Sequence, residues 1–263
     1  MQMTRTVKIL SSDLSELLHD PFVDLEKLEG VVYRRQPGRK TIAFPHHEKT
    51  YFAKIHTGVG WKEIIKNLFQ LRWPIISAEP EWKALSKLKT LGIKAPVPVA
   101  FGKQGVNPAR LQSFIITEAI TFTINLEEFL KTKNTQEFPV KKRFIEAVAN
   151  IAKTLHDNGI NHRDFYLCHF LLDTAESDPL NPQIYLIDLH RAQCRRKVPF
   201  RWRVKDIAGL YFSTMNFNFT TRDYLRFIRG YTGQPLRATL KQDKFFWRTV
   251  RLKANKLYRK FSL

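Results

Sequence analysis

The chain has 263 residues, enough for one large or two small domains, and carries 44 Lys and Arg against 24 Asp and Glu, a formal net charge of +20. Such an excess predicts acidic partners, and nucleic acids, anionic lipid headgroups and acidic saccharides all qualify by charge. No stretch resembles a signal peptide or approaches the roughly 18–20 apolar residues of a membrane-spanning helix, and two cysteines are too few for a disulfide framework or a zinc site. We therefore expect a cytoplasmic protein.

The N-terminal part is predicted to contain a strand, KTYFAKIHTG, in which Lys54 alternates with apolar residues. A lysine buried in such a strand needs an anionic partner. The next predicted helix, EWKALSKLKTLG, offers Glu81 in its first turn. Glu79 is the competing partner, but it precedes Pro80 and is expected to lie outside the helix. The alternative is a surface lysine and a glutamate that only interacts with the helix dipole.

An apparent insertion, WKEIIKNLFQLRWP, lies between the lysine strand and this helix at residues 61–74. Its apolar residues recur at helical spacing: Ile64, Ile65, Leu68, Phe69 and Trp73. The segment either packs as a core helix or docks on a membrane or lipid surface.

The apolar strand SFIITEAI ends at Glu118, and the boundary between two lobes is predicted near Ile120 to Asn125. A long amphipathic helix is predicted from about Val140 to His156, with Gly159 as its C-terminal stop. This helix leads directly to the tripeptide HRD.

Two aspartates follow that helix, Asp164 in the tripeptide and Asp188 at the end of an apolar run. Phosphoryl transfer needs one carboxylate that orients the attacking hydroxyl and another that holds Mg²⁺ on the nucleotide phosphates. HRD alone could be a solvated turn. Its significance comes from the order of the parts, because lysine strand, glutamate helix, linker strand, long helix, catalytic loop and metal strand follow one another as they do in kinases.

The chain resembles the lipopolysaccharide kinase family in stretches that cover most of residues 28–229, among them AEPEWKAL, FIITEAI, GINHRDFYLCHFLL and YLIDLHRAQCRRKVPFRWRVKDIAGLYFS. The resemblance implies a two-lobed, protein-kinase-like α+β fold. Residues 1–120 would form an N-terminal lobe, mostly antiparallel sheet, and residues 121–263 a mostly helical C-terminal lobe. It also implies ATP-dependent phosphorylation, with Mg²⁺, of a hydroxyl on the first heptose of the lipopolysaccharide inner core.

The resemblance assigns roles by position. On the nucleotide side, Lys54 would hold the phosphates, Glu81 would brace Lys54, and the backbone at Glu118, Ala119 and Ile120 would contact the adenine.

On the catalytic side, Asp164 would be the base, Asp188 a Mg²⁺ ligand and Asp206 a brace for the catalytic loop. His169 stands where protein kinases have a metal-binding asparagine, and it either binds the metal or only hydrogen-bonds the loop. The metal motif reads Asp-Leu-His instead of DFG. The phosphate-covering hairpin, which the resemblance places at about 28–44, lacks a G-x-G-x-x-G motif, since Gly30 and Gly38 are its only nearby glycines.

A basic run follows Asp188: residues 191–205 hold seven Lys and Arg and no acid. In a kinase this is where the acceptor lies, so an acidic acceptor is predicted, and inner-core lipopolysaccharide carries carboxylates and phosphates. The alternative is a solvated loop. The predicted acceptor-binding residues are Arg191, Arg195, Arg196, Lys197, Arg201 and Arg203.

The C-terminal segment, residues 241–263, has eight Lys and Arg against one acid and keeps one apolar face. It is either a basic amphipathic helix on an anionic membrane surface or a helix packed on its own lobe.

These observations predict a kinase that works peripherally at the inner face of the inner membrane. The alternatives are a protein or small-molecule kinase of the same fold and a non-catalytic basic protein that binds RNA or membrane. A polybasic acceptor loop argues against a cationic substrate, and the joint presence of the lysine and both aspartates argues against a mere binder. We expect no nucleic-acid partner, while the charge leaves room for an acidic protein partner.

Overall fold

The computed structural model describes residues 4–69, 74–132, 138–176, 178 and 180–261. The chain divides into two compact units, the first formed by residues 1–87 and 96–120 and the second by residues 88–95 and 121–263. Both contain helices and antiparallel strands, so the predicted α+β class is confirmed.

The first unit is built on a six-stranded antiparallel sheet with the order β1-β5-β6-β4-β3-β2. The strands are β1 (Arg5–Ile9), β2 (Val31–Gln36), β3 (Arg39–His46), β4 (Lys49–His56), β5 (Pro98–Gln104) and β6 (Gln112–Glu118). Strands β2 and β3 form the hairpin expected at about 28–44.

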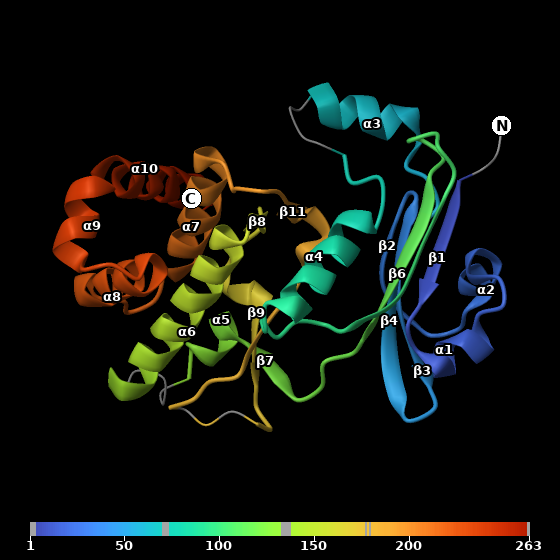
Figure 1. Ribbon diagram of the computed structural model, residues 1–263, viewed down its shortest axis with the longest axis horizontal. Coiled ribbons are helices and arrows are strands. Elements are labelled where there is room, and N and C mark those ends of the chain that lie inside the picture. Colours follow the sequence, from blue (N-terminus) through green and yellow to red (C-terminus); the bar gives the residue numbers. More distant parts are fainter. Residues whose placement is uncertain (1–3, 70–73, 133–137, 177, 179, 262–263) are drawn as a thin grey trace. The chain divides into compact units, whose positions relative to one another are not determined.

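Two short helices, α1 (Ser12–Leu17) and α2 (Pro21–Lys27), pack on one face of this sheet (Figure 1). Their core includes Tyr51, Ala53 and Ile55 of β4. Because side chains alternate along a strand, Lys54 points to the opposite face. Helix α4 (Glu79–Thr90) covers that opposite face, where Trp82 stacks on Phe101 of β5.

The insertion between β4 and α4 forms helix α3 (Gly60–Phe69). The remaining predicted residues of that segment, 70–73, lie outside the described residues. The core-helix interpretation is wrong for most of α3, because Ile64 is its one buried side chain.

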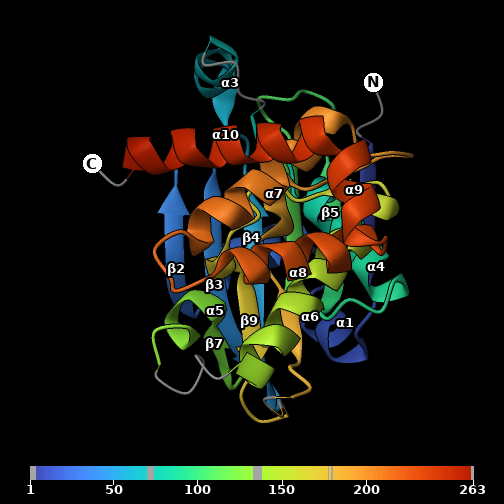
Figure 2. The ribbon, with the colours of Figure 1, turned by 90° about the vertical axis from the view of Figure 1, so that its left-hand side faces the viewer.

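The second unit contains the long helix α6 (Phe138–Asp157), which the sequence predicted at about 140–156. Helix α8 (Thr221–Thr232) packs along α6, and α10 (Lys244–Phe261) packs across α7 (Phe200–Thr214) (Figure 2). The short helices α5 (Leu126–Phe129) and α9 (Leu236–Gln242) complete the helical part.

Helix α10 settles one alternative left open by the sequence. Its apolar face is used within the unit, because Phe246, Val250 and Ala254 are buried. Its outer face is basic, with Arg248 and Arg251 exposed. The C-terminal segment therefore packs on its own unit, as one of the two interpretations predicted.

Small sheets in the second unit position the loops that follow α6. One has the order β10-β9-β7, from β7 (Thr123–Asn125), β9 (Phe170–Asp173) and β10 (Ile184–Leu186). The other pairs β8 (Ile160–Asn161) with β11 (Gln193–Cys194). Gly159 links α6 to β8 at φ 74°, and a Cβ there would lie 1.9 Å from the carbonyl oxygen of Arg195, so this turn requires glycine.

Candidate functional site

In the first unit, the strand lysine and the helix glutamate meet. Lys54 Nζ donates to Glu81 Oε1 at 2.6 Å, and the Glu81 side chain is almost fully buried. A buried carboxylate requires such a cation, because its charge would otherwise lose hydration without compensation. The lysine is partly exposed, so its ammonium can also contact an anion from outside the protein.

Glu79 has a different role from the one expected. It begins α4, so the prediction that it lies outside the helix is wrong, and Pro80 occupies the second helical position, where the missing N–H costs no helical hydrogen bond. Its carboxylate binds Lys83 and Lys103 at 2.6 and 2.7 Å, and these two hydrogen bonds hold the pKa of Glu79 below its usual value. Glu79 therefore does not compete for Lys54.

The end of β6 offers fewer backbone groups than the sequence prediction assumed. The N–H of Glu118 donates to the carbonyl of Val97 at 3.0 Å, and the N–H of Ala119 donates to that of Thr50 at 2.9 Å. The Glu118 carboxylate forms an exposed ion pair with Lys49 at 2.7 Å. Both amides are thus already paired within the unit.

In the second unit, the loop after α6 is held by a buried aspartate from α7. Asp206 Oδ2 accepts from the N–H of His162 at 2.7 Å, and Oδ1 accepts from the N–H of Arg163 at 2.8 Å. Arg163 has φ 76°, an uncommon conformation for a residue with a side chain, and its guanidinium lies 4.8 Å from the Trp202 ring centroid. The buried carboxylate therefore fixes the backbone immediately before Asp164.

Asp206 is itself held by a chain of hydrogen bonds through the helical core. His156 Nε2–H donates to Asp206 at 3.3 Å, and the hydroxyl of Tyr231 donates to His156 Nδ1 at 2.8 Å. Burial raises the pKa of Tyr231 to about 12, so the hydroxyl keeps its proton. Arg203 Nε in turn donates to this hydroxyl at 3.0 Å.

Asp164 faces cations. Arg191 NH1 contacts its two carboxylate oxygens at 3.0 and 3.2 Å. Lys205 adds a second positive charge near this carboxylate: burial lowers the pKa of Lys205 to about 8, although Asp164 acts to raise it. The sequence analysis did not assign Lys205 a role. The signal was its position directly before Asp206, on the helix that braces the loop.

The second aspartate lies among histidines. Asp188, in the left-handed region at φ 63°, begins the 3₁₀ turn η3 (Leu189–Arg191) and contacts His190 Nδ1 through Oδ1. Its Oδ2 lies 3.4 Å from His169 Nε2, and His169 Nδ1–H donates to the Asp164 carbonyl at 2.6 Å. Burial lowers the pKa of His169, but contacts with Cys168, the Asp164 carbonyl and Asp188 outweigh it and raise the pKa to about 9.

This donor set fits Mg²⁺ better than a transition metal. Across the described residues, no cluster of three or more His, Cys, Asp or Glu side chains could hold a metal ion. Mg²⁺ needs no such cluster, because it is commonly bound by one or two carboxylates together with substrate phosphates and water. The Asp188 carboxylate is partly exposed and can serve in this way.

The basic run divides into two groups. Arg191 binds Asp164, Arg195 donates to Asn161 and Gln193, and Arg203 lies over the rings of Tyr231 and Phe246. Arg195 links β8 to β11 and Arg203 links α7 to α8, so both side chains have contacts within the unit, and their predicted acceptor-binding role stays a prediction. The exposed members are Arg196, Lys197 and Arg201.

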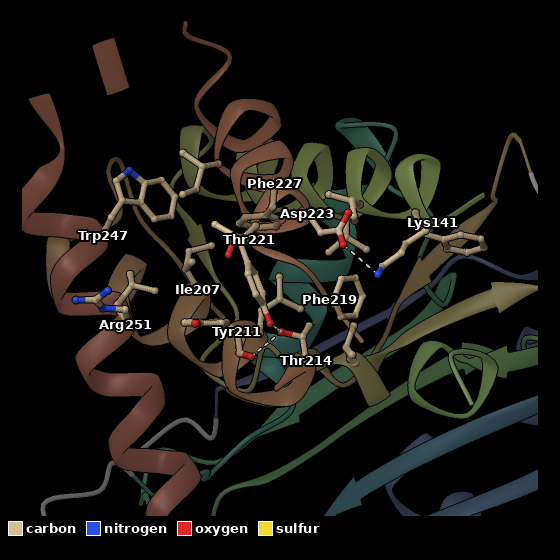
Figure 3. Close-up of a pocket in the computed structure, with 18 of the residues that line it drawn as sticks. Lys141, Ile207, Tyr211, Thr214, Phe219, Thr221, Asp223, Phe227, Trp247 and Arg251 are labelled. Atoms are coloured by element: carbon tan, nitrogen blue, oxygen red, sulfur yellow. Dashed lines mark hydrogen bonds and ion pairs between the residues drawn. The ribbon is translucent and has the colours of Figure 1, made fainter. Parts of the chain in front are cut away.

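The second unit also contains an apolar cavity of about 580 Å³ between α6, α7, α8 and α10 (Figure 3). Its walls include Val148, Ile207 and Phe227, and Lys141 forms a 3.0 Å ion pair with Asp223 at one end. On α10, exposed Arg248 and Arg251 lie at its border. The sequence analysis did not predict this cavity, because its lining comes from four helices that are distant in the chain.

Comparisons with known proteins agree with this architecture. The family model "Lipopolysaccharide kinase (Kdo/WaaP) family" matches residues 23–231. The chain is 44% identical over 241 residues to lipopolysaccharide core heptose(I) kinase WaaP of Escherichia coli, covering 90% of this chain and 91% of that protein. It is 43% identical over 242 residues to the protein of the same name from Pseudomonas aeruginosa, covering 91% and 90%.

A solved structure, "WaaP in complex with acyl carrier protein", superposes with a TM-score of 0.82 at 36% identity, covering 98% of this chain and 100% of that one. In the described part of the chain, no helix is both long enough and apolar enough to cross a membrane.

Proposed function

The chain belongs to the lipopolysaccharide kinase (Kdo/WaaP) family, and we propose that it transfers phosphate from ATP to a hydroxyl of heptose(I) in the lipopolysaccharide core. One observation carries this proposal beyond the family name. His169 links Asp164 and Asp188, because its Nδ1–H donates to the Asp164 backbone carbonyl and its Nε2 lies 3.4 Å from Asp188 Oδ2; Asp206 holds the amide that precedes Asp164. This is the pair of carboxylates that phosphoryl transfer requires.

We assign the roles as follows. Asp164 accepts a hydrogen bond from the attacking hydroxyl and orients it, and its proton-accepting strength matters less than this positioning. Lys54, braced by Glu81, binds phosphate oxygens of ATP, and the backbone at Glu118 and Ile120 contacts the adenine. Asp188 is the protein ligand for Mg²⁺, which when bound neutralises negative charge on the phosphates.

His169 is better placed to organise the loop than to bind the metal. Its Nδ1–H is fixed by the Asp164 carbonyl, and its Nε2 lies 3.4 Å from Asp188 Oδ2, so both ring nitrogens already have partners within the loop. We therefore propose that His169 orients Asp188 and the Asp164 backbone.

The acceptor side is basic. We propose that the exposed Arg196, Lys197 and Arg201 bind carboxylates or phosphates of the inner core, while Arg191 holds Asp164 until the acceptor hydroxyl arrives. Cations at this position suit an acidic saccharide and disfavour a cationic small molecule, which argues against the alternative of a small-molecule kinase for cationic substrates.

The test uses purified core oligosaccharide as the acceptor and mass spectrometry as the readout. Asp164→Asn and Asp188→Asn are expected to lower turnover by at least about a hundredfold, since each tenfold loss corresponds to about 1.4 kcal/mol of barrier. Asp157→Asn, which removes an exposed carboxylate from α6, is the matched control and should leave turnover unchanged. Wild-type turnover in a folded Asp188→Asn variant would refute the assignment.

A second proposal concerns a protein partner. The solved structure of WaaP holds an acyl carrier protein, and we propose that this chain binds one too. Arg248 and Arg251 on α10 would attract its acidic surface, and the neighbouring apolar cavity would accommodate its acyl chain. Calorimetry with acylated and non-acylated carrier protein tests both parts. Ile207→Trp, which fills the cavity, should abolish the preference for the acylated form.

The acceptor is anchored in lipid, so we also propose that the protein associates peripherally with the anionic inner membrane surface. The net charge of +20 supports this association.

A further inference from the structure

Helix α3 presents an apolar surface to solvent. Among its ten residues, Trp61 is 56% exposed, Ile65 48%, Leu68 48% and Phe69 86%. Ile64 is the one buried side chain. A surface helix of a globular protein normally packs its apolar residues on the core, so this arrangement is reversed.

The exposed residues occupy one face of α3. At 3.6 residues per turn, the five apolar side chains fall within an arc of about 140°, with Trp61, Leu68 and Ile65 near its centre. Lys62 borders this arc next to Phe69, and Lys66 lies farther round the helix on the same side. The acidic Glu63 lies on the opposite side, where it interacts with Lys66 and Asn67. Within α3, the apolar face therefore has lysines along one edge, Gly60 and Asn67 along the other, and no carboxylate at either edge.

A backbone hydrogen bond attaches the N-terminal end of α3 to the rest of the first unit, and Ile64 is the one side chain that packs along the helix. The N–H of Gly60 donates to the carbonyl of Ala109 at 3.0 Å, and a Cβ on Gly58 would lie 2.8 Å from that carbonyl oxygen. This contact joins α3 to the loop between β5 and β6, which also carries the exposed Arg110. Figure 1 shows α3 beyond the ends of the strands, off both faces of the sheet.

An isolated helix shorter than about 12–15 residues is marginal in water, because packing of the apolar face supplies most of the stability. Helix α3 has ten residues and buries one of them. A surface that receives its apolar face is therefore needed for a stable helix.

We propose that α3 is a membrane-docking helix whose apolar face inserts into an anionic lipid surface while Lys62 and Lys66 remain among the headgroups. An apolar face with a central tryptophan and lysines along one edge is an arrangement that suits a helix lying in the membrane interface. Four exposed side chains form too small a patch for a stable protein interface, which buries about 800 Å² on each partner. The inference rests on the proposed function, because it gives the enzyme a means to reach a lipid-anchored acceptor.

Flotation of the full-length protein with vesicles tests the docking directly. The vesicles are phosphatidylcholine alone or phosphatidylcholine with phosphatidylglycerol. Wild-type protein should bind the anionic vesicles, and Ile65→Ser/Leu68→Ser should weaken this binding at least about tenfold, since two apolar side chains no longer leave water. Lys62→Gln/Lys66→Gln should reduce the preference for anionic over neutral vesicles.

The matched control is Val31→Ser/Leu252→Ser, which removes two comparably exposed aliphatic side chains from β2 and α10 and should bind vesicles as wild type does. Equal vesicle binding by the Ile65→Ser/Leu68→Ser variant and wild type would overturn the proposal. So would a wild-type dimer in sedimentation that the same substitutions dissociate, because the apolar face would then belong to a second copy.

A kinetic comparison separates this inference from the proposed function. The Ile65→Ser/Leu68→Ser variant should phosphorylate a soluble, deacylated core acceptor at the wild-type rate but lose activity on the same acceptor presented in vesicles. If wild type phosphorylates neither acceptor, the proposed function fails, and the flotation result still decides the docking. If the variant keeps full activity on the vesicle-bound acceptor, the docking proposal fails and the proposed function stands.

Discussion

Replacing Asp206 by alanine should both destabilise the second unit and disorganise the loop that carries Asp164. The Asp206 carboxylate is buried and accepts hydrogen bonds from the N–H groups of His162 and Arg163 and from His156 Nε2–H. Alanine provides no acceptor, and the cavity it leaves is too enclosed to hydrate all three donors. The substitution therefore leaves buried donors without partners.

The magnitude follows from those donors. A buried N–H that loses its partner costs about 1–3 kcal/mol, so two donors cost about 2–6 kcal/mol if water compensates the third. This is a large part of the 5–15 kcal/mol that typically stabilises a folded protein. In addition, Arg163 is held at φ 76°, a conformation that costs on the order of 1 kcal/mol or more and that should relax once its N–H is released.

Hydrogen exchange measured by NMR or mass spectrometry checks this prediction locally, and denaturant unfolding checks it globally. The amides of His162 and Arg163 should lose protection in Asp206→Ala. The rate of phosphoryl transfer should also fall, even at denaturant concentrations at which the variant is still folded. Leu210→Ala, on the same helix, is the control: it should cost a comparable 2–5 kcal/mol through a cavity but leave those two amides protected. If both amides keep wild-type protection in Asp206→Ala, the bracing role is refuted.

Three further predictions follow from the site. Arg196→Ala/Lys197→Ala should raise KM for the core acceptor, and the difference in KM from wild type should narrow as salt screens the exposed charges. Arg203→Ala should instead lower the melting temperature, because the Arg203 guanidinium packs on core rings, and equal melting temperatures for wild type and Arg203→Ala would contradict this part. Glu81→Gln should raise KM for ATP and lower kcat, so that kcat/KM for ATP falls by about 10–100-fold, while KM for the acceptor changes little. Unchanged ATP kinetics would show that the ion pair between Lys54 and Glu81 is only structural. Burial lowers the pKa of His162 below the value of about 6.5 expected in the unfolded chain, so the unfolded state binds more protons and the free energy of unfolding should fall as pH drops below about 6.5. His162→Gln should weaken this loss of stability at acid pH, measured by urea unfolding at several pH values. An unchanged pH dependence would assign the loss to other groups.

Much of the site was predictable because its parts are short motifs that act through local geometry. Lys54 could be identified from a strand in which it interrupts apolar residues, and Glu81 from the first turn of the following helix; the structure brings their side chains to 2.6 Å. The α+β class followed from the alternation of strand and helix patterns. These features depend on chain order and periodicity, which a sequence contains directly.

The basic run shows where sequence reasoning fails. Residues 191–205 look uniformly available for an acidic ligand, but a charged side chain can also be used inside the protein when a partner lies nearby. Arg203 on α7 donates to Tyr231 on α8, 28 residues later in the chain, and Arg195 donates to Asn161 across a two-stranded sheet. No local pattern distinguishes these arginines from the exposed Arg196.

By itself, the sequence determined the fold class and the order of the strand and helix parts, and it predicted catalytic roles for two aspartates, because these features depend on short stretches and their order in the chain. Only the tertiary structure decided that Asp206 is bound to both amides before Asp164, that the apolar cavity exists, and that α3 leaves its apolar face uncovered. The physical reason is the same in all three cases. Burial and hydrogen-bond partnership depend on what packs against a residue from distant parts of the chain, and an amphipathic pattern states that a face will be covered without stating what covers it.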